Sequence, residues 1–170
     1  MPDVNLRPVR ASDLDALDSL NSEQDDPFNF FGFRASDVWH RRFAETGLVS
    51  EENGTLVIED EAGAMLGDIS WRMVHYGPTA ASRAYNIGIA LLPPHRGRGY
   101  GSAAQVALAR YLFRTTGVQR VEASTDVENV AEQRSLEKAG YQREGVLRRA
   151  QYRAGDWHDM VVYSVLRGEV

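Results

Sequence analysis

Three short segments with strand-like patterning follow one another near the middle of the chain. They cover residues 56–60, 65–75 and 84–91, and the turn signal Glu61-Ala62-Gly63 lies between the first two. Connections this short hold no crossover helix, so they join antiparallel neighbours. A glycine-rich loop and a segment with helical spacing, residues 102–113, follow directly. The pattern predicts an α+β fold in which an antiparallel meander leads into a strand, a loop and a helix.

The rest of the chain extends this pattern on both sides. Further strands are expected at residues 4–7, 118–125, 141–147 and 160–166, and further helices at residues 11–20, 36–46 and 130–139. Gly140 follows the last helix as a C-terminal stop signal. The element order is therefore βααβββαβαββ. At 170 residues without an internal repeat or a linker, the chain predicts a single domain covering residues 1–170.

Composition excludes several classes of function. The chain has no cysteine, which excludes disulfides, thiolate metal sites and a cysteine nucleophile, and we expect no metal. A net charge of −5 argues against broad nucleic-acid binding, which needs a basic surface. No apolar run reaches the roughly 18 residues of a membrane helix, and residues 1–5 lack a signal-peptide pattern. We therefore expect a cytoplasmic protein without nucleic-acid or membrane partners.

The loop after the third strand has the features of a phosphate site. Gly97, Gly99 and Gly101 alternate just before the helix, so the backbone can approach a ligand closely. A helix N-terminus offers unpaired N–H groups and a partial positive charge. Arg96 and Arg98 add donors with the geometry that phosphate prefers. The alternative interpretation is a tight connection without a ligand.

Two other nucleotide-binding motifs compete for the same loop. Gly99, Gly101 and Ala104 satisfy a loose dinucleotide fingerprint, and Glu122 follows roughly twenty residues later. Against it, residues 93–96 separate the strand from the glycines, and a meander precedes them instead of parallel βαβ units. A P-loop is excluded because no Gly-Lys-Ser/Thr follows.

These residues resemble the GNAT acetyltransferase superfamily. Leu91-x-Pro93-x-x-Arg96-Gly97-x-Gly99-x-Gly101 is similar to its acetyl-CoA-binding signature, and Asn129 with Leu136-Glu137-Lys138-x-Gly140-Tyr141 is similar to its second motif. The end of the chain, Glu144-Gly145-x-Leu147-Arg148 and Gly155-x-Trp157-x-Asp159, looks like the branch of the RimJ/RimL N-terminal acetyltransferases and many small-molecule acetyltransferases.

The resemblance implies a GNAT fold, with helices on both faces of a seven-stranded mixed sheet. The sheet would be splayed between the strand ending at Leu91 and the strand at residues 118–125, with acetyl-CoA as co-substrate in the cleft. The backbone of Leu91 would contact the thioester oxygen, where an amide donor stabilises developing charge. Asn129 would contact the pantetheine arm or cap the following helix. The expected cofactor contacts are Leu91, Arg96, Gly97, Arg98, Gly99, Tyr100, Gly101, Ser102 and Asn129.

The family's usual acid and base are missing. Asn86 stands where many relatives have a glutamate, and Leu136 where a tyrosine is common. The serine that RimL-like enzymes place near the sulfur aligns with Glu132, and Ser135 lies one turn further on. Glu132, Ser135 and Asn86 are therefore the catalytic candidates, beside the backbone of Leu91. The alternatives are that Glu132 is a solvated surface carboxylate and that Ser135 only packs beneath the cofactor.

The resemblance places the acceptor near the first two helices and their loop. The aromatic residues there could form a wall, and the acidic ones attract an ammonium, which favours an amine with an apolar body. The candidate residues are Asp26, Phe28, Phe30, Phe31 and Trp39; the alternative is that the aromatics pack the helices onto the sheet. We expect acetylation of a small-molecule amine. The alternatives are N-terminal protein acetylation of the RimJ/RimL type and a non-catalytic acyl-CoA-binding module. Relatives in this branch are often homodimers.

Overall fold

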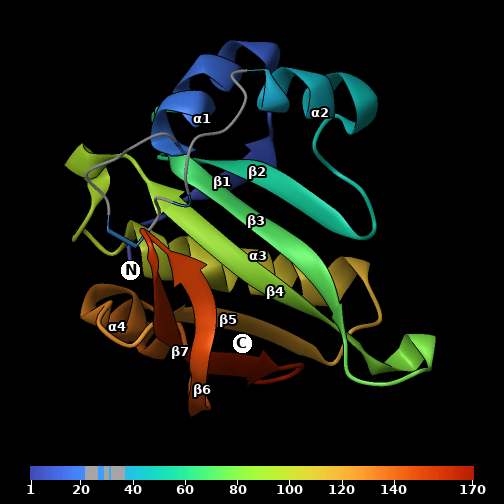
Figure 1. Cartoon of the computed structure of the whole chain (residues 1–170). Coiled ribbons are helices and arrows are strands. Elements are labelled where there is room, and N and C mark those ends of the chain that lie inside the picture. Colours follow the sequence, from blue (N-terminus) through green and yellow to red (C-terminus); the bar gives the residue numbers. More distant parts are fainter. Residues whose placement is uncertain (22–26, 29–30, 32–36) are drawn as a thin grey trace.

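The protein forms one mixed seven-stranded sheet with helices on both faces. The computed structural model describes residues 1–21, 27–28, 31 and 37–170. The strand order is β1-β2-β3-β4-β5-β7-β6 (Figure 1). The strands are β1 (Asn5–Pro8), β2 (Asn53–Glu59), β3 (Met65–His75), β4 (Arg83–Leu91), β5 (Arg120–Asp126), β6 (Gln142–Arg153) and β7 (Asp156–Leu166). The expected fold is confirmed, including the order of the main helices and strands.

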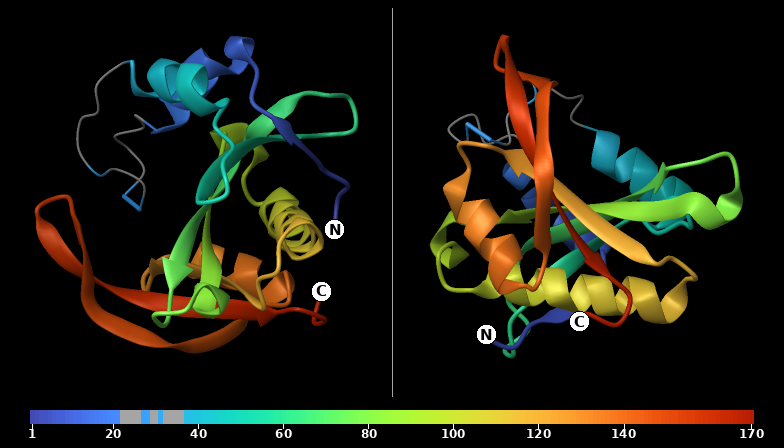
Figure 2. Two further views of the ribbon diagram at one scale, coloured as in Figure 1. Left: turned by 90° about the vertical axis from the view of Figure 1, so that its right-hand side faces the viewer. Right: turned by 90° about the horizontal axis from the view of Figure 1, so that it is seen from below.

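The helices divide between the two faces (Figure 2). They are α1 (Leu14–Asn21), α2 (Val38–Thr46), α3 (Tyr100–Thr115) and α4 (Val130–Lys138). Alternation along β2 explains the division, because neighbouring side chains point to opposite faces. Val57 packs in a cluster with Leu17 of α1 and Trp39 of α2. Leu56 and Ile58 instead join the larger core cluster that contains the buried face of α3.

Strands β4 and β5 are neighbours for only part of their length. They pair in parallel through Tyr85↔Val121, Asn86↔Glu122 and Ile87↔Ala123. β4 continues to Leu91 and β5 to Asp126, so both strands run on beyond the last shared pair without pairing further with each other. The sheet is therefore splayed at the carboxyl ends of these two strands. This edge of parallel strands is where open sheets bind ligands.

The last hairpin is longer than the sequence predicted. The two strands were expected at residues 141–147 and 160–166, but β6 and β7 pair out to Arg153↔Asp156. A register shift between Leu147 and Gln151 lets the pairing resume after an irregular step. The polar residues in this stretch hide the strand alternation, which is why the sequence did not predict it. The hairpin projects beyond the rest of the sheet (Figure 2).

Two sequence-based alternatives can now be assessed. The dinucleotide-binding alternative is wrong, because β2, β3 and β4 are antiparallel and the described residues before the glycine loop form no βαβ unit. In the part of the chain that the structure describes, no helix combines the length and the apolar character that crossing a membrane requires.

Candidate active site

The glycine loop delivers the N-terminus of α3 to the splayed end of the sheet. Gly97 and Gly99 have left-handed φ angles of 71° and 86°, which other residues rarely adopt, and α3 begins at Tyr100. Among the residues that the structure describes, no side chain forms a capping hydrogen bond at Gly99. The first N–H groups of a helix have no partner within it, so Tyr100, Gly101 and Ser102 present donors to an anion. This geometry fits the pyrophosphate of a coenzyme A thioester.

The two arginines of the loop lie in different places. The side chain of Arg96 turns back, and its Nε donates to the carbonyl oxygen of Leu91 at 2.8 Å. It therefore ties the loop to the end of β4. Arg98 is exposed beside the start of α3. Of the two, Arg98 is better placed to meet a phosphate.

The end of β4 directs backbone donors into the splay. The N–H of Leu92 donates to the carbonyl of Leu66 in β3 at 2.9 Å. Neighbouring residues of a strand direct their backbone groups to opposite sides, so the N–H groups of Ile89 and Leu91 point away from β3. On that side β5 no longer pairs with β4. The N–H of Leu91 thus points into the gap between β4 and β5; that it contacts a thioester oxygen there stays a prediction.

A chain of polar side chains connects the glycine loop to α4. Ser102 Oγ lies 3.2 Å from Ser135 Oγ, and Ser135 donates to Gln105 Oε1 at 3.1 Å. Gln105 Nε2 in turn donates to Glu132 Oε1 at 2.5 Å. A Cβ added to Gly101 would lie 3.1 Å from Ser135 Oγ, so Ser135 packs closely beneath the loop.

Glu132 lies between α3 and α4, not on the outer surface. The interpretation as a solvated carboxylate is therefore wrong, because the side chain turns inward to Gln105. Burial raises its pKa to about 7, against the smaller opposing effect of the Gln105 hydrogen bond. A carboxyl group that titrates near neutrality can hold or release a proton under working conditions. Asn129 caps α4 through a 3.2 Å hydrogen bond from the N–H of Glu132.

Asn86 lies on the other face of the sheet. Its Nδ2 donates to Oε1 of Glu122 at 3.4 Å, across the middle of the three β4–β5 pairs. Val121 and Ala123 of β5 belong to the core beneath α3, so Glu122 between them faces the opposite way. Asn86 and the Glu132 chain are therefore separated by the sheet.

The predicted acceptor residues are only partly described. Asp26 and Phe30 lie outside the described residues. Phe28 packs its ring against the Arg153 guanidinium, 5.7 Å from the ring centroid, and Phe31 is 47% exposed. Trp39 is 6% exposed within the α1–α2 core cluster. Trp39 therefore matches the packing interpretation and has little surface left for an acceptor.

Sequence reasoning missed the side chains around Glu122. This residue was considered only as the acidic member of a dinucleotide motif. Arg120 Nε donates to its Oε2 at 2.9 Å, and the hydroxyl of Tyr76 donates to the same oxygen. Alternation along β5 could have placed Glu122 opposite the core. Its contact with Tyr76, 46 residues away, could not be read from the sequence.

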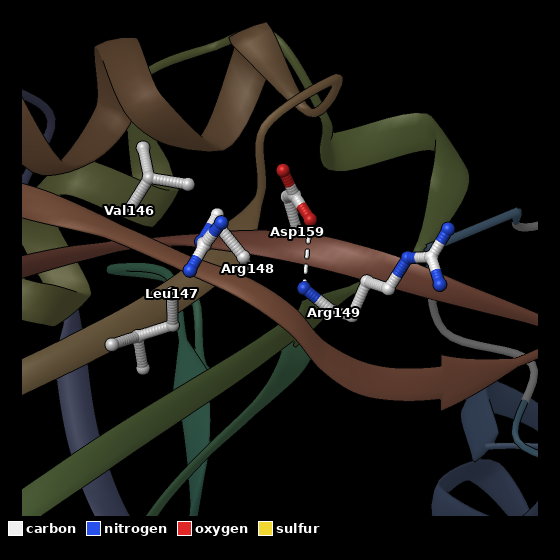
Figure 3. Close-up of a pocket in the computed structure, with 5 residues that line it drawn as sticks. All are labelled: Val146, Leu147, Arg148, Arg149 and Asp159. Atoms are coloured by element: carbon white, nitrogen blue, oxygen red, sulfur yellow. Dashed lines mark hydrogen bonds between the residues drawn. The ribbon is translucent and has the colours of Figure 1, made fainter.

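A shallow hollow of about 760 Å³ lies at the irregular step of β6 (Figure 3). It is lined by Val146, Leu147, Arg148, Arg149 and Asp159. Asp159 Oδ1 accepts the backbone N–H of Arg149 at 2.7 Å, and Arg149 has a left-handed φ of 47°. Asp159 thus holds the shape of the hairpin.

The chain matches the family model described as "Acetyltransferase (GNAT) domain" over residues 3–142. The chain belongs to the GNAT acetyltransferase family. The uncharacterized N-acetyltransferase YoaA of Bacillus subtilis is 35% identical to this GNAT chain over 50% of it, which is 48% of YoaA. The probable N-acetyltransferase YjcK of the same organism is 26% identical over 96% of the chain and 93% of YjcK. The protein is thus an N-acetyltransferase of the GNAT type.

Solved structures share the fold of this GNAT protein. The spermidine N-acetyltransferase of Vibrio cholerae, in complex with CoA and spermine, superposes with a TM-score of 0.84 at 19% identity, covering 98% of this chain and 96% of that one. RimJ of Mycobacterium smegmatis, in complex with CoA-disulfide, gives a TM-score of 0.78 at 23% identity, covering 99% and 84%. At these identities the likeness concerns the fold.

Proposed function

We propose that this GNAT enzyme transfers the acetyl group of acetyl-CoA to a primary amine of a small molecule. One observation carries the proposal: the uncapped N-terminus of α3 and the inward-facing N–H groups of Ile89 and Leu91 meet at the same splayed edge. The first suits a pyrophosphate and the second a thioester carbonyl. When bound, acetyl-CoA supplies the acetyl group as an activated thioester.

The residues around the splay have distinct roles in this proposal. The N–H groups at the start of α3 hold the pyrophosphate, and Leu91 stabilises charge on the carbonyl oxygen. Glu132 lies on the face of the sheet covered by α3 and α4. Its pKa of about 7 lets the carboxyl group hold a proton for the departing CoA thiolate. Ser135 positions the glycine loop. In this proposal the amine attacks the thioester directly, and the cysteine-free chain excludes an acyl intermediate carried on a thiol.

The size of a pocket on the sheet face opposite α3 and α4 favours a small-molecule acceptor over a protein N-terminus. A pocket of about 560 Å³ lies there, within the range of small-molecule sites. The complex of the V. cholerae neighbour with CoA and spermine supports the same choice. The RimJ neighbour supports N-terminal acetylation as the alternative. A non-catalytic module is the third candidate and predicts binding without turnover.

The test combines binding and turnover. Calorimetric titration with acetyl-CoA should show binding, and NAD should show none. Arg98→Ala should weaken acetyl-CoA binding by about tenfold, because a charge-assisted hydrogen bond contributes roughly 1.5–3 kcal/mol. Arg114→Ala, at the other end of α3, is the matched control and should leave binding unchanged.

Turnover is measured on amines and on peptides with free N-termini. Release of the CoA thiol can be followed with a thiol reagent, and the cysteine-free chain adds no background. Mass spectrometry then identifies the acetylated product. Acetylated small amines support the proposal, acetylated peptides alone would favour the RimJ-type alternative, and binding without any product would favour the non-catalytic module.

A further inference from the structure

The face of the sheet opposite α3 and α4 carries a pocket that the cofactor site does not use. It has a volume of about 560 Å³ and lies over β5, β6 and β7. Its polar lining includes Tyr76, Arg120, Glu122 and Glu144, and its apolar lining is Val146, Leu147 and Val162. We call it the Glu122 pocket.

Two carboxylates in this pocket share one guanidinium. Arg120 donates to Glu144 through Nη1 and Nη2, both at 2.6 Å, and to Glu122 through Nε at 2.9 Å. The Arg120 hydrogen bonds lower the pKa of Glu144 to about 2. All three nitrogens of the guanidinium are therefore engaged, and the ring of Tyr76 lies 5.5 Å from its centre. The carboxylates of Glu122 and Glu144 and the guanidinium of Arg120 together carry a net formal charge of −1.

That excess charge is concentrated near Glu122, which is 6% exposed. Its Oε2 accepts hydrogen bonds from Arg120 and Tyr76. Within the described part of the chain, its Oε1 has a single donor, Asn86 Nδ2, at the long distance of 3.4 Å. A carboxylate oxygen accepts about two hydrogen bonds, so Oε1 can take another donor. Because Arg120 is shared with Glu144, the buried Glu122 carboxylate is only partly neutralised, and this favours a further cation at Oε1.

The pocket lies at a defined distance from the splay. Glu122 pairs with Asn86, one step before the last β4–β5 pair. Ile89, whose N–H faces the gap, is three residues further along β4, which corresponds to about 10 Å. A cation bound at Glu122 is therefore not the nitrogen that reacts at the splay. An apolar chain lying along Val146, Leu147 and Val162 could join the two positions.

We propose that the Glu122 pocket binds a second cationic group of the acceptor, so that the acceptor is a diamine whose nitrogens are separated by an apolar chain. This inference rests on the proposed function and specifies the substrate of that same site. Glu122 receives the distal ammonium, Glu144 keeps the Arg120 guanidinium occupied, and the three apolar side chains contact the methylene groups.

Three probes of equal chain length test the proposal: hexanediamine, hexylamine and aminohexanoate carry a cationic, neutral or anionic far end. Their equilibrium binding to the protein is measured by calorimetry, both with CoA present and without it. The wild-type protein should bind hexanediamine about tenfold or more tightly than hexylamine, since a charge-assisted hydrogen bond contributes roughly 1.5–3 kcal/mol. Aminohexanoate should bind most weakly of the three.

Glu122→Gln should reduce the preference for hexanediamine over hexylamine to about twofold or less, at unchanged acetyl-CoA affinity. Glu144→Gln, at a half-exposed position, should reduce the same preference by freeing Arg120 to neutralise Glu122. Glu59→Gln is the matched control, because Glu59 also pairs with an arginine, Arg7, but at the far edge of the sheet. It should keep the wild-type preference.

Two results would overturn the proposal. One is a wild-type affinity ratio of hexanediamine to hexylamine near one, and the other is a wild-type ratio that persists in both Glu122→Gln and Glu144→Gln. The binding ratios do not depend on turnover. If acetyl-CoA fails to bind or no amine is acetylated, the proposed function fails, while the ratios measured on the same protein still decide whether the pocket selects a second cation.

Discussion

Glu132 shows how a single residue can link the cofactor side of the protein to pH. Its carboxyl group accepts a hydrogen bond from Gln105, which in turn accepts one from Ser135, and it lies close enough to the buried Tyr141 to raise the pKa of that phenol. Burial raises the pKa of Glu132 from 4.5 to about 7. The folded chain therefore binds this proton more tightly than the unfolded chain. The contribution to stability is complete below about pH 4.5 and is lost as the pH rises through about 7.

Glu132→Gln should remove this loss of stability at high pH. The difference between 4.5 and about 7 corresponds to an upper limit of about 3 kcal/mol. We expect the variant to be more stable than the wild type at about pH 8 and similar to it near pH 4.5, as measured by urea unfolding. Glu128→Gln, at an exposed position just before α4, should show no such pH dependence. Equal wild-type and Glu132→Gln stability at both pH values would contradict the assigned environment.

At this scale the sequence predicted backbone roles better than side-chain roles. The loop glycines and the start of α3 follow from local conformation and were found directly. The environment of Glu132 depends on Gln105, 27 residues away, and that of Glu122 on Tyr76, 46 residues away. Contacts of this kind are set by the packing of helices and strands and have no local signal.

At the scale of helices and strands, one buried ion pair joins the tip of the β6–β7 hairpin to the end of β5. Arg153 near its tip is paired with Asp126 at the end of β5, and both side chains are 2% exposed. Burial opposes ionisation of Asp126, but hydrogen bonds from the Glu128 N–H and from Arg153 outweigh it and hold its pKa below the ordinary value. His158 Nδ1 lies 3.0 Å from the same carboxylate, and Phe28 packs on Arg153.

Arg153→Met should destabilise the protein by about 3–5 kcal/mol, because it leaves the Asp126 charge buried without its main partner. Adding Asp126→Asn should recover part of this loss, since the unpaired charge is then removed. Urea unfolding of the two variants and the wild type measures both effects. Arg110→Met, at an exposed position on α3, is the control. A cost below about 1 kcal/mol for Arg153→Met would show that the pair is not essential to the hairpin.

On the scale of the whole molecule, the splay leaves two parts of the sheet joined by a short parallel seam. Strands β1–β4 and β5–β7 share three residue pairs, with α3 packed on β3 and β4 and α4 packed on β5. The succession of helices and strands could be predicted from patterning, because each segment carries its own period. The extent of the last hairpin could not, since it depends on an irregular step and on the Asp126–Arg153 pair.

Acetyl-CoA bound at the seam should stabilise the whole fold. Ligand at about 100 times its Kd adds about 2.7 kcal/mol, which for a chain of this size corresponds to a rise in Tm of about 5–10 °C. Thermal unfolding with and without the ligand measures the shift, and NAD at the same concentration should give none. No rise with acetyl-CoA would contradict binding at the splay.

The two outermost strands of the sheet also affect how the protein behaves in a concentrated solution. β1 has only four residues, and β6 combines two register shifts with charged positions that include Arg143 and Arg148. Short, irregular and charged rims are poor templates for strand addition by another chain. The sheet can therefore remain open at its centre for chemistry while its rims discourage the intermolecular pairing that leads to aggregation.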